Sequence, residues 1–186
     1  KLMPHLHVSV QALDDKILQL MRRKYDAQFV TDILQKVQRE VPGVSLTADI
    51  IVGFPQEEEI NFENTLRNLE KIGFSDLHVF PYSDRERTSA LLLDGKIESS
   101  EKKRRVREIE KLNVIKYKEY RENMLNSIQR VYIEEIVEDR AFGYTENYIR
   151  TFINLKNRNF LELKVSDLVD VRIINFDGTL LEGDVI

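Results

Sequence analysis

Three short segments in the first half of the chain alternate between two kinds of side chain, and this alternation most constrains the fold. Residues 5–11, 46–53 and 76–83 each have the pattern of a β-strand, because successive side chains of a strand point to opposite faces. In each segment one set of side chains is apolar and the other is polar or aromatic. A parallel strand buried on both faces is apolar throughout. The pattern therefore predicts an α/β barrel with helices on its outside and a ligand pocket on its inside.

Helical patterns occupy the stretches between these strands. Two acidic residues begin a helix at residues 14–21, which favours a helix N-terminus there. The apolar stripes of the next two helices are expected to be Phe29, Ile33, Leu34, Val37 and Val41, and then Phe62, Thr65, Leu66, Leu69 and Ile72. The order of strands and helices predicts parallel strands with right-handed crossovers. Pro81 indicates that the third strand lies at an edge, because proline cannot donate to the ladder, so the predicted barrel is open.

The chain enters its first strand after four residues, so we expect it to be part of a larger protein and to begin partway through the barrel. It has no apolar run long enough to span a membrane and no signal peptide, which predicts a cytoplasmic protein without a membrane partner. The sequence contains no cysteine, and this excludes disulfides, thiolate metal sites and cysteine catalysis within these residues.

A long basic helix is expected from residue 98 to residue 123. Its apolar contacts are expected to come from Val106, Ile109, Leu112, Val114, Ile115 and Tyr117. The basic run at residues 102–105 is compatible with phosphate contacts, although such a run is more often the solvated face of a helix.

After residue 126 the pattern changes to short strands, expected at residues 129–137, 148–155, 160–165, 168–174 and 180–185, with a turn at residues 139–143. Five short strands predict a small antiparallel barrel similar to the OB-fold, and hence a division into domains 1–123 and 124–186. Such barrels bind single-stranded nucleic acid through aromatic and basic side chains. The candidates here are Tyr144, Asn147, Tyr148, Arg150, Phe152, Lys156 and Arg158. Acidic residues outnumber basic ones in this region, which on charge alone favours an ordinary small barrel.

Five segments, taken in order, resemble the radical-SAM methylthiotransferases. They are HLHVSVQ at residues 5–11, MRRKY at 21–25, DIIVGFP at 49–55, LHVFPYSDR at 77–85 and GYTENYI at 143–149. The last segment resembles the start of that family's TRAM domain. The segment from His78 to Ser83, followed by Arg85 and Thr88, is most similar to the branch that acts on threonylcarbamoyladenosine in tRNA.

The resemblance implies the C-terminal half of an open radical-SAM barrel followed by an RNA-binding TRAM barrel. It further implies an enzyme that adds a methylthio group to a hypermodified adenosine, with tRNA as partner and a sulfur donor that the sequence does not identify. Its cofactors are S-adenosylmethionine and two 4Fe–4S clusters, which the family holds on cysteines. Because those cysteines are absent here, this chain alone is expected to be inactive.

The resemblance implies that four residues contact S-adenosylmethionine. Gly53 ends a strand where barrel sites form, and without a Cβ it lets an adenosyl group approach the backbone. Gln11, also at a strand end, offers a hydrogen bond. Arg23 is expected to pair either with the cofactor carboxylate or with an acidic neighbour such as Asp14. Asp49 is placed in the same site, as a structural carboxylate rather than a catalytic base, and no catalytic residue is assigned.

The pair His5 and His7 also fits a metal site, but both residues open their strand, as His78 opens its own. Chemistry in barrels of this kind occurs at the C-terminal ends of strands. We therefore expect no metal site.

The chain departs from the family at three glycine positions, which Leu13, Gln56 and Arg87 occupy. Where the backbone needs a positive φ, each replacement costs about 1 kcal/mol. Two other function classes therefore stay open. The first is a non-catalytic RNA-binding relative of the family, and the second is an unrelated open-barrel metal-dependent hydrolase.

Overall fold

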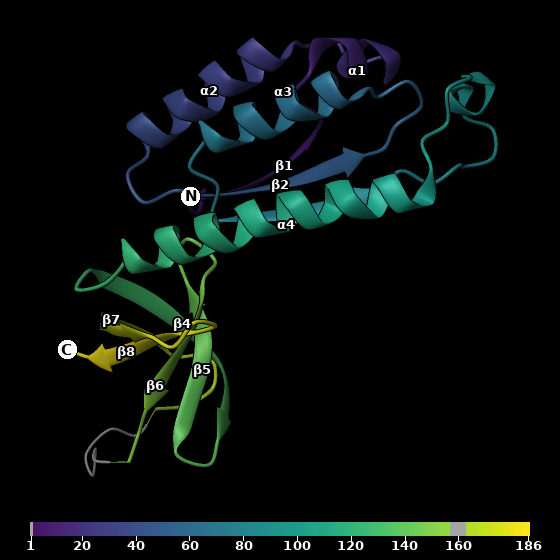
Figure 1. Cartoon of the computed structure of the whole chain (residues 1–186). Helices are drawn as coiled ribbons and strands as arrows, with labels where there is room; N and C mark the ends of the chain where they lie inside the picture. The colour runs from purple at the N-terminus through teal and green to yellow at the C-terminus, as the bar shows by residue number, and fades with distance from the viewer. Residues whose placement is uncertain (1, 157–162) are drawn as a thin grey trace. The chain divides into compact units, whose positions relative to one another are not determined.

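The computed structural model describes residues 2–156 and 163–186 (Figure 1). The chain forms two compact units. An α/β unit comprises Leu6–Pro42 and Leu46–Tyr117, and a barrel unit comprises Lys118–Ile186 with the short pieces Lys1–His5 and Gly43–Ser45. The division between the two compact units falls within the long helix, between Tyr117 and Lys118, and the domain boundary after residue 123 stays a prediction.

The α/β unit is built on a three-stranded sheet in the order β1 (His5–Gln11), β2 (Ser45–Val52) and β3 (Asp76–Pro81). Strands β2 and β3 are parallel, with Asp49 opposite His78 and Val52 opposite Pro81. The apolar face predicted from the alternation is buried, including Val10, Leu46, Ala48, Ile50, Val52 and Leu77. In this sheet β3 lies at the edge, as Pro81 predicted.

Four α-helices accompany the strands: α1 (Asp15–Leu20), α2 (Ala27–Glu40), α3 (Glu59–Glu70) and α4 (Ser99–Glu122), with a short 3₁₀ helix η1 (Ser89–Leu92) before the last (Figure 1). Aspartates begin the first two. Asp14 accepts a hydrogen bond from the Ile17 amide at 3.1 Å, and Asp26 accepts one from the Phe29 amide at 2.7 Å. Each bond satisfies an amide that the helix itself leaves unpaired.

The buried face of α2 differs from the predicted one. Phe29 is 59% exposed, and Ile33 and Val41 are also exposed, so this part of the prediction was wrong. The residues that pack inward are Ala27, Val30, Thr31 and Leu34, which recur at helical spacing on a neighbouring face. The stripe predicted for α3 is confirmed, since Phe62, Thr65, Leu69 and Ile72 are buried.

Helix α4 is confirmed, but two of its predicted apolar contacts are wrong. Val114 and Ile115 are 68% and 54% exposed. Ile109 is fully buried, as predicted, and the charged residues Arg105 and Lys116 are buried as well. Lys116 donates to the carbonyls of Ile72 at 2.6 Å and Glu70 at 3.1 Å, beside the C-terminus of α3 where helix carbonyls have no partner within the helix. A sequence pattern that counts only apolar residues misses such a position.

The barrel unit contains the closed barrel of β4 (Ile128–Val137), β5 (Arg140–Thr145), β6 (Arg150–Asn154), β8 (Leu181–Val185) and β7 (Leu168–Phe176), in that spatial order. The all-β prediction is confirmed, although β6 and β8 pair in parallel rather than antiparallel. The barrel core is apolar and includes Val131, Ile133, Ala141, Ile153, Val171, Ile173 and Leu181.

Strand β5 occupies most of the segment that was predicted to be a turn. Its inward residues are small, namely Ala141, Gly143 and Thr145, so the segment lacks the large apolar side chains that mark a strand. A Cβ at residue 143 would overlap the backbone carbonyl of Tyr132 on β4, so this position requires glycine. Of the strand predicted at residues 160–165, residues 163–165 are not a strand and the rest lies outside the described residues. No helix in the described part of the chain has both the length and the apolar character required to cross a bilayer.

Candidate functional site

A pocket of about 600 Å³ lies in the α/β unit near the ends of the three strands. Gln11 at the end of β1, Arg23 after α1 and Asp49 on β2 line it, so the structure brings together three of the four residues predicted to bind a cofactor. Its apolar wall includes Ile51, Phe54 and Phe80, and Arg22 and Arg85 add two further cationic groups. A pocket of this size, mostly apolar with a few convergent polar groups, is typical of small-molecule sites.

The backbone around this pocket is strained. Gln11 and Arg22, which line it, have φ values of +69° and +56°. Arg87, between two lining residues, has a φ of +64°. Side chains other than glycine rarely adopt this left-handed conformation, which costs about 1–2 kcal/mol for each residue. Such strain collects at functional sites, where surrounding contacts hold it in place.

Gln56 and Arg87, which stand where the resembled family has glycine, both have a positive φ, of +66° and +64°. The sequence-based expectation of strain is thus confirmed at these two positions. Leu13 is not among the residues with positive φ and is fully buried, so the chain has changed shape there instead.

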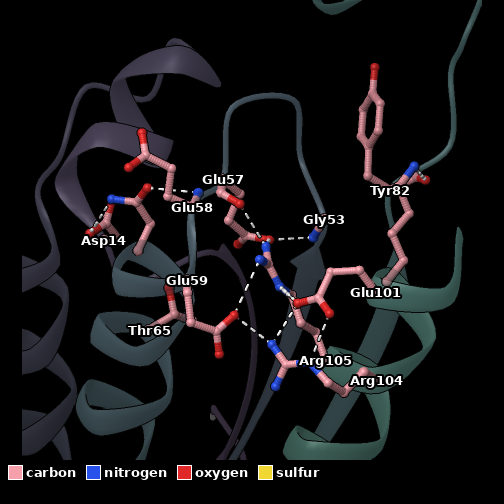
Figure 2. A network of polar contacts seen from close by, with 12 residues as sticks. Asp14, Gly53, Glu57, Glu58, Glu59, Thr65, Tyr82, Glu101, Arg104 and Arg105 are labelled. Atoms are coloured by element: carbon pink, nitrogen blue, oxygen red, sulfur yellow. Dashed lines mark hydrogen bonds and ion pairs between the residues drawn. The ribbon is translucent and has the colours of Figure 1, made fainter. Parts of the chain in front are cut away.

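Gly53, the fourth predicted cofactor residue, is not part of the pocket lining. Its φ is +74°, and the Lys102 side chain fills the space beside its Cα. The Gly53 amide donates to the carboxylate of Glu57 in the following loop (Figure 2). The absence of a Cβ at Gly53 therefore leaves room for the Lys102 side chain of α4.

Glu57 and Arg105 form a buried ion pair behind this loop (Figure 2). The two side chains are 1% and 4% exposed, and Arg105 Nη1 lies 2.7 Å from Glu57 Oε2 and 2.8 Å from the Glu57 carbonyl oxygen. Burial raises the pKa of Glu57, while the Gly53 amide and Arg105 oppose that rise. One charged pair thus fastens the loop after β2 to α4.

Arg104, the neighbour of Arg105, is held by three carboxylates. It bonds Glu59, Glu101 and Glu108, each at 2.5 Å. The Arg104 guanidinium, together with that of Arg105, lowers the pKa of Glu101 to about 2. Lys102 donates to the Tyr82 carbonyl at 3.0 Å. Three side chains of the basic run, Lys102, Arg104 and Arg105, thus bond to partners within the α/β unit. Arg105 is buried, so it is neither available to a phosphate nor part of a solvated helix face.

The alternative pairing of Arg23 with Asp14 does not occur. Asp14 is buried and accepts hydrogen bonds from Ile17, Asn61 and Asn64. Arg23 is exposed at the pocket, and within the described part of the chain no carboxylate pairs with it. Its guanidinium therefore stays available to a ligand.

The barrel unit has an aromatic surface made of Tyr144, Tyr148 and Arg150. The two tyrosine rings stack with centroids 4.6 Å apart and planes 15° apart. The Arg150 guanidinium carbon lies 5.1 Å from the Tyr144 ring centroid. Tyr148 is 60% exposed, so it is not a core residue. Arg150 is paired with Glu134 at 3.0 Å and with Glu135, which reduces the positive charge of this surface.

The remaining predicted RNA contacts are placed differently. Asn147 is buried and donates to the Tyr120 hydroxyl at 2.8 Å, and Phe152 is buried as well. Lys156 pairs with Asp139 at 3.0 Å, and Arg158 lies outside the described residues. The sequence analysis missed Tyr132, which is 44% exposed and lines a second pocket of about 500 Å³ together with Tyr144 and Tyr148. Its alternation with the inward residues Val131 and Ile133 was the signal that could have found it.

Comparison with known proteins gives consistent matches. Residues 2–69 match the family model of the radical SAM superfamily. The chain is 36% identical over 155 residues to a threonylcarbamoyladenosine tRNA methylthiotransferase of Bacillus subtilis, covering 81% of this chain and 34% of the relative. It is 33% identical over 193 residues to the enzyme of that name from Thermotoga maritima, covering 100% of this chain and 43% of the relative.

A third relative carries a different name. The tRNA-2-methylthio-N(6)-dimethylallyladenosine synthase of Endomicrobium trichonymphae is 36% identical over 180 residues, covering 90% of this chain and 42% of the relative. The chain thus spans less than half the length of these curated relatives. Among solved structures, a multidomain protein with nucleic acid binding domains from Streptococcus pneumoniae aligns with 34% of this chain and 23% of its own, at 22% identity. Its TM-score of 0.32 does not indicate a shared fold.

Proposed function

Because this chain is related to the radical-SAM tRNA methylthiotransferases over nearly its whole length, we propose that it is part of an enzyme that adds a methylthio group to a hypermodified adenosine in tRNA. The observation that carries the proposal is the pocket where Gln11, Arg23 and Asp49 meet. These residues come from three segments of the chain that resemble that family. The segment from His78 to Ser83, with Arg85 and Thr88, favours N6-threonylcarbamoyladenosine as the substrate.

S-adenosylmethionine fits the residues of this pocket. The exposed guanidinium of Arg23 suits its carboxylate, because arginine binds carboxylates through two parallel hydrogen bonds. Ile51, Phe54 and Phe80 offer apolar surface for its adenine, and Gln11 offers a hydrogen bond. When bound, this cofactor supplies the radical and the methyl group, while the protein supplies position and electrostatics.

The residues of this chain do not fit an iron–sulfur cluster. Such clusters are held chiefly by cysteine thiolates, and the sequence has no cysteine. We therefore assign the two 4Fe–4S clusters of the whole enzyme to residues outside this chain, and the chain alone is expected to be inactive.

The barrel is proposed to bind tRNA as a TRAM domain. Tyr148, which is exposed and stacks on the half-buried Tyr144, offers an aromatic surface for an unpaired base. Stacking of a base on an aromatic side chain contributes about 1–3 kcal/mol and tolerates any base. We omit Asn147 and Phe152 from this surface because both are buried.

Nucleoside analysis of tRNA tests the proposal. The gene is deleted in its own organism, and tRNA digests are compared by mass spectrometry. The expected result is loss of the methylthio derivative of N6-threonylcarbamoyladenosine, with accumulation of N6-threonylcarbamoyladenosine itself. Loss of the dimethylallyladenosine derivative instead would reassign the substrate, and an unchanged nucleoside profile would contradict the enzyme assignment.

A second candidate is a tRNA-binding relative without catalytic activity. The observation that favours it is the strain at Gln56 and Arg87, where the family has glycine. Under this candidate the nucleoside profile is unchanged in the deletion strain, yet the purified chain still binds tRNA. The two measurements together separate the candidates.

A further inference from the structure

Three side chains with metal-binding atoms meet on the polar face of the sheet. His7 comes from β1, Asp49 from β2 and His78 from β3, so each of three neighbouring strands supplies one of them. Asp49 and His78 are opposite each other in the register of β2 and β3. Their convergence depends on strand pairing, and for that reason a reading of single segments does not find it.

The distances match those between ligands of one metal ion. His7 Nε2 lies 3.1 Å from Asp49 Oδ2, and His78 Nδ1 lies 3.6 Å from Asp49 Oδ1. One ligand atom from each residue can be chosen so that all three lie within 4.8 Å of one another. In a tetrahedral site with metal–ligand bonds of about 2.0–2.1 Å, neighbouring ligand atoms are about 3.4 Å apart.

A direct network of hydrogen bonds accounts for only part of this geometry. The 3.1 Å separation between His7 and Asp49 suits either a hydrogen bond or a shared ion. The 3.6 Å separation between His78 and Asp49 is too long for a hydrogen bond. Two ligands that flank an ion have a separation of this kind.

Outer contacts already orient two of the three side chains. His7 Nδ1 lies 2.8 Å from the Thr47 hydroxyl, and donation of its N–H to that oxygen leaves the Nε2 lone pair directed at the cluster. The Ser9 hydroxyl donates to Asp49 Oδ2 at 3.4 Å. Metal-binding histidines usually have such a partner for their other ring nitrogen, because it fixes the tautomer and the ring orientation.

We propose that His7, Asp49 and His78 bind one divalent transition-metal ion of the zinc class, with at least one coordination position open to a water or an anionic ligand. Two histidines and one carboxylate are a common donor set for zinc and also for non-haem iron(II). Asp49 belongs both to this cluster and to the pocket lining, so the ion would lie beside the pocket. The site revises the expectation of no metal, which rested on His5, His7 and His78 each lying at the start of its strand.

Zinc titration of the purified 186-residue chain tests this site. The chain is treated with a chelator and then titrated calorimetrically with Zn²⁺ in a buffer that does not bind metals. We expect one ion per chain, and a visible absorption spectrum of tetrahedral Co²⁺ when cobalt replaces zinc. Because the chain has no cysteine, neither signal can come from a thiolate-held cluster.

His7→Gln and His78→Gln are each expected to weaken zinc binding at least tenfold and to remove the cobalt spectrum. Thr47→Val, which removes only the outer partner of His7, is expected to weaken binding about 10–100-fold. His5→Gln is the matched control, since His5 is on the same strand and the same face but outside the cluster. Circular dichroism verifies that each variant is folded. The His7 and His78 side chains are 41% and 48% exposed, so folding should persist.

No saturable binding at one ion per chain would overturn the site. So would equal losses in His5→Gln and His7→Gln, or wild-type affinity in His78→Gln. None of these results depends on methylthiotransferase activity, so the metal site and the proposed function can fail separately.

Discussion

The pocket of the α/β unit and the aromatic surface of the barrel unit are held in place in different ways. At the pocket, the buried pair of Glu57 and Arg105 fastens the loop after β2, and the backbone has a strained, positive φ at several residues. On the barrel, Tyr148 is mostly exposed and its neighbour Arg150 is paired with surface glutamates. The first region therefore depends on interior charge, whereas the second is expected to accept substitution of its exposed side chains without loss of the fold.

The largest effect is expected from removal of the buried charge partner. Glu57→Ala removes the buried counter-ion of Arg105, which keeps Glu101 at 2.8 Å and Glu59 at 3.5 Å. The free energy of unfolding should therefore fall by about 3 kcal/mol, the lower end of the range for a broken buried pair. Denaturant unfolding followed by circular dichroism at 222 nm reports on the α/β unit, which holds most of the helical residues described. Glu40→Ala is the control, because its pair with Lys36 is exposed and should contribute less than about 1 kcal/mol. Equal losses in both variants would contradict the buried anchor.

On the barrel, Tyr148→Ala should weaken tRNA binding by about 1–3 kcal/mol through loss of stacking, with little change in melting temperature. Phe152→Ala is the contrasting variant, since Phe152 is 7% exposed and its loss should destabilise the barrel. Because Arg150 is paired with Glu134 and Glu135, tRNA binding should depend only weakly on salt. A tRNA titration and a thermal melt of both variants measure these effects. A sharp fall in the melting temperature of Tyr148→Ala, with unchanged binding, would show that Tyr148 serves the fold.

A smaller effect, an increase in the free energy of unfolding, is expected where glycine replaces a residue with positive φ. Gln56→Gly and Arg87→Gly should each stabilise the α/β unit by about 1 kcal/mol, because glycine adopts a positive φ without steric cost. Leu13→Gly should be destabilising, since Leu13 is buried and its φ is not positive. Urea unfolding of the three variants provides the comparison. A loss of stability in Gln56→Gly and Arg87→Gly would show that the strain is offset by contacts of their side chains.

The smallest effect is a pH dependence from Glu101. Arg104 lowers the pKa of Glu101 to about 2 in the folded protein, below its ordinary value of 4.5. The folded state therefore binds fewer protons here, and this stabilisation is present above about pH 4.5 and lost as the pH falls toward about 2. Glu101→Gln should melt at a lower temperature at neutral pH and show a shallower decline across that window. Parallel melting curves of both proteins would rule out a contribution from Glu101.

The two regions also differ in how far the sequence predicts them. Strict alternation in 46–53 predicted the buried and polar faces of β2, because one face packs on helices along the whole strand. The inward positions of Arg105 and Lys116 were not predicted, since they depend on partners distant in the sequence. The same holds for the barrel, where β5 buries small residues that carry no strong pattern. The cluster of His7, Asp49 and His78 likewise exists only once three strands are paired.

Calorimetric titration of S-adenosylmethionine into the whole protein, with its clusters reconstituted, tests the pocket most directly. Gly53→Val is unsuitable, because the new side chain would meet Lys102 and disturb the loop. Arg23→Ala removes an exposed cation from the pocket, and loss of a charged hydrogen bond of about 1.5–3 kcal/mol should weaken binding roughly 10–150-fold. Arg39→Ala on α2, outside the pocket lining, should bind as the wild type does. Wild-type affinity in Arg23→Ala would contradict the assignment of this pocket to the cofactor.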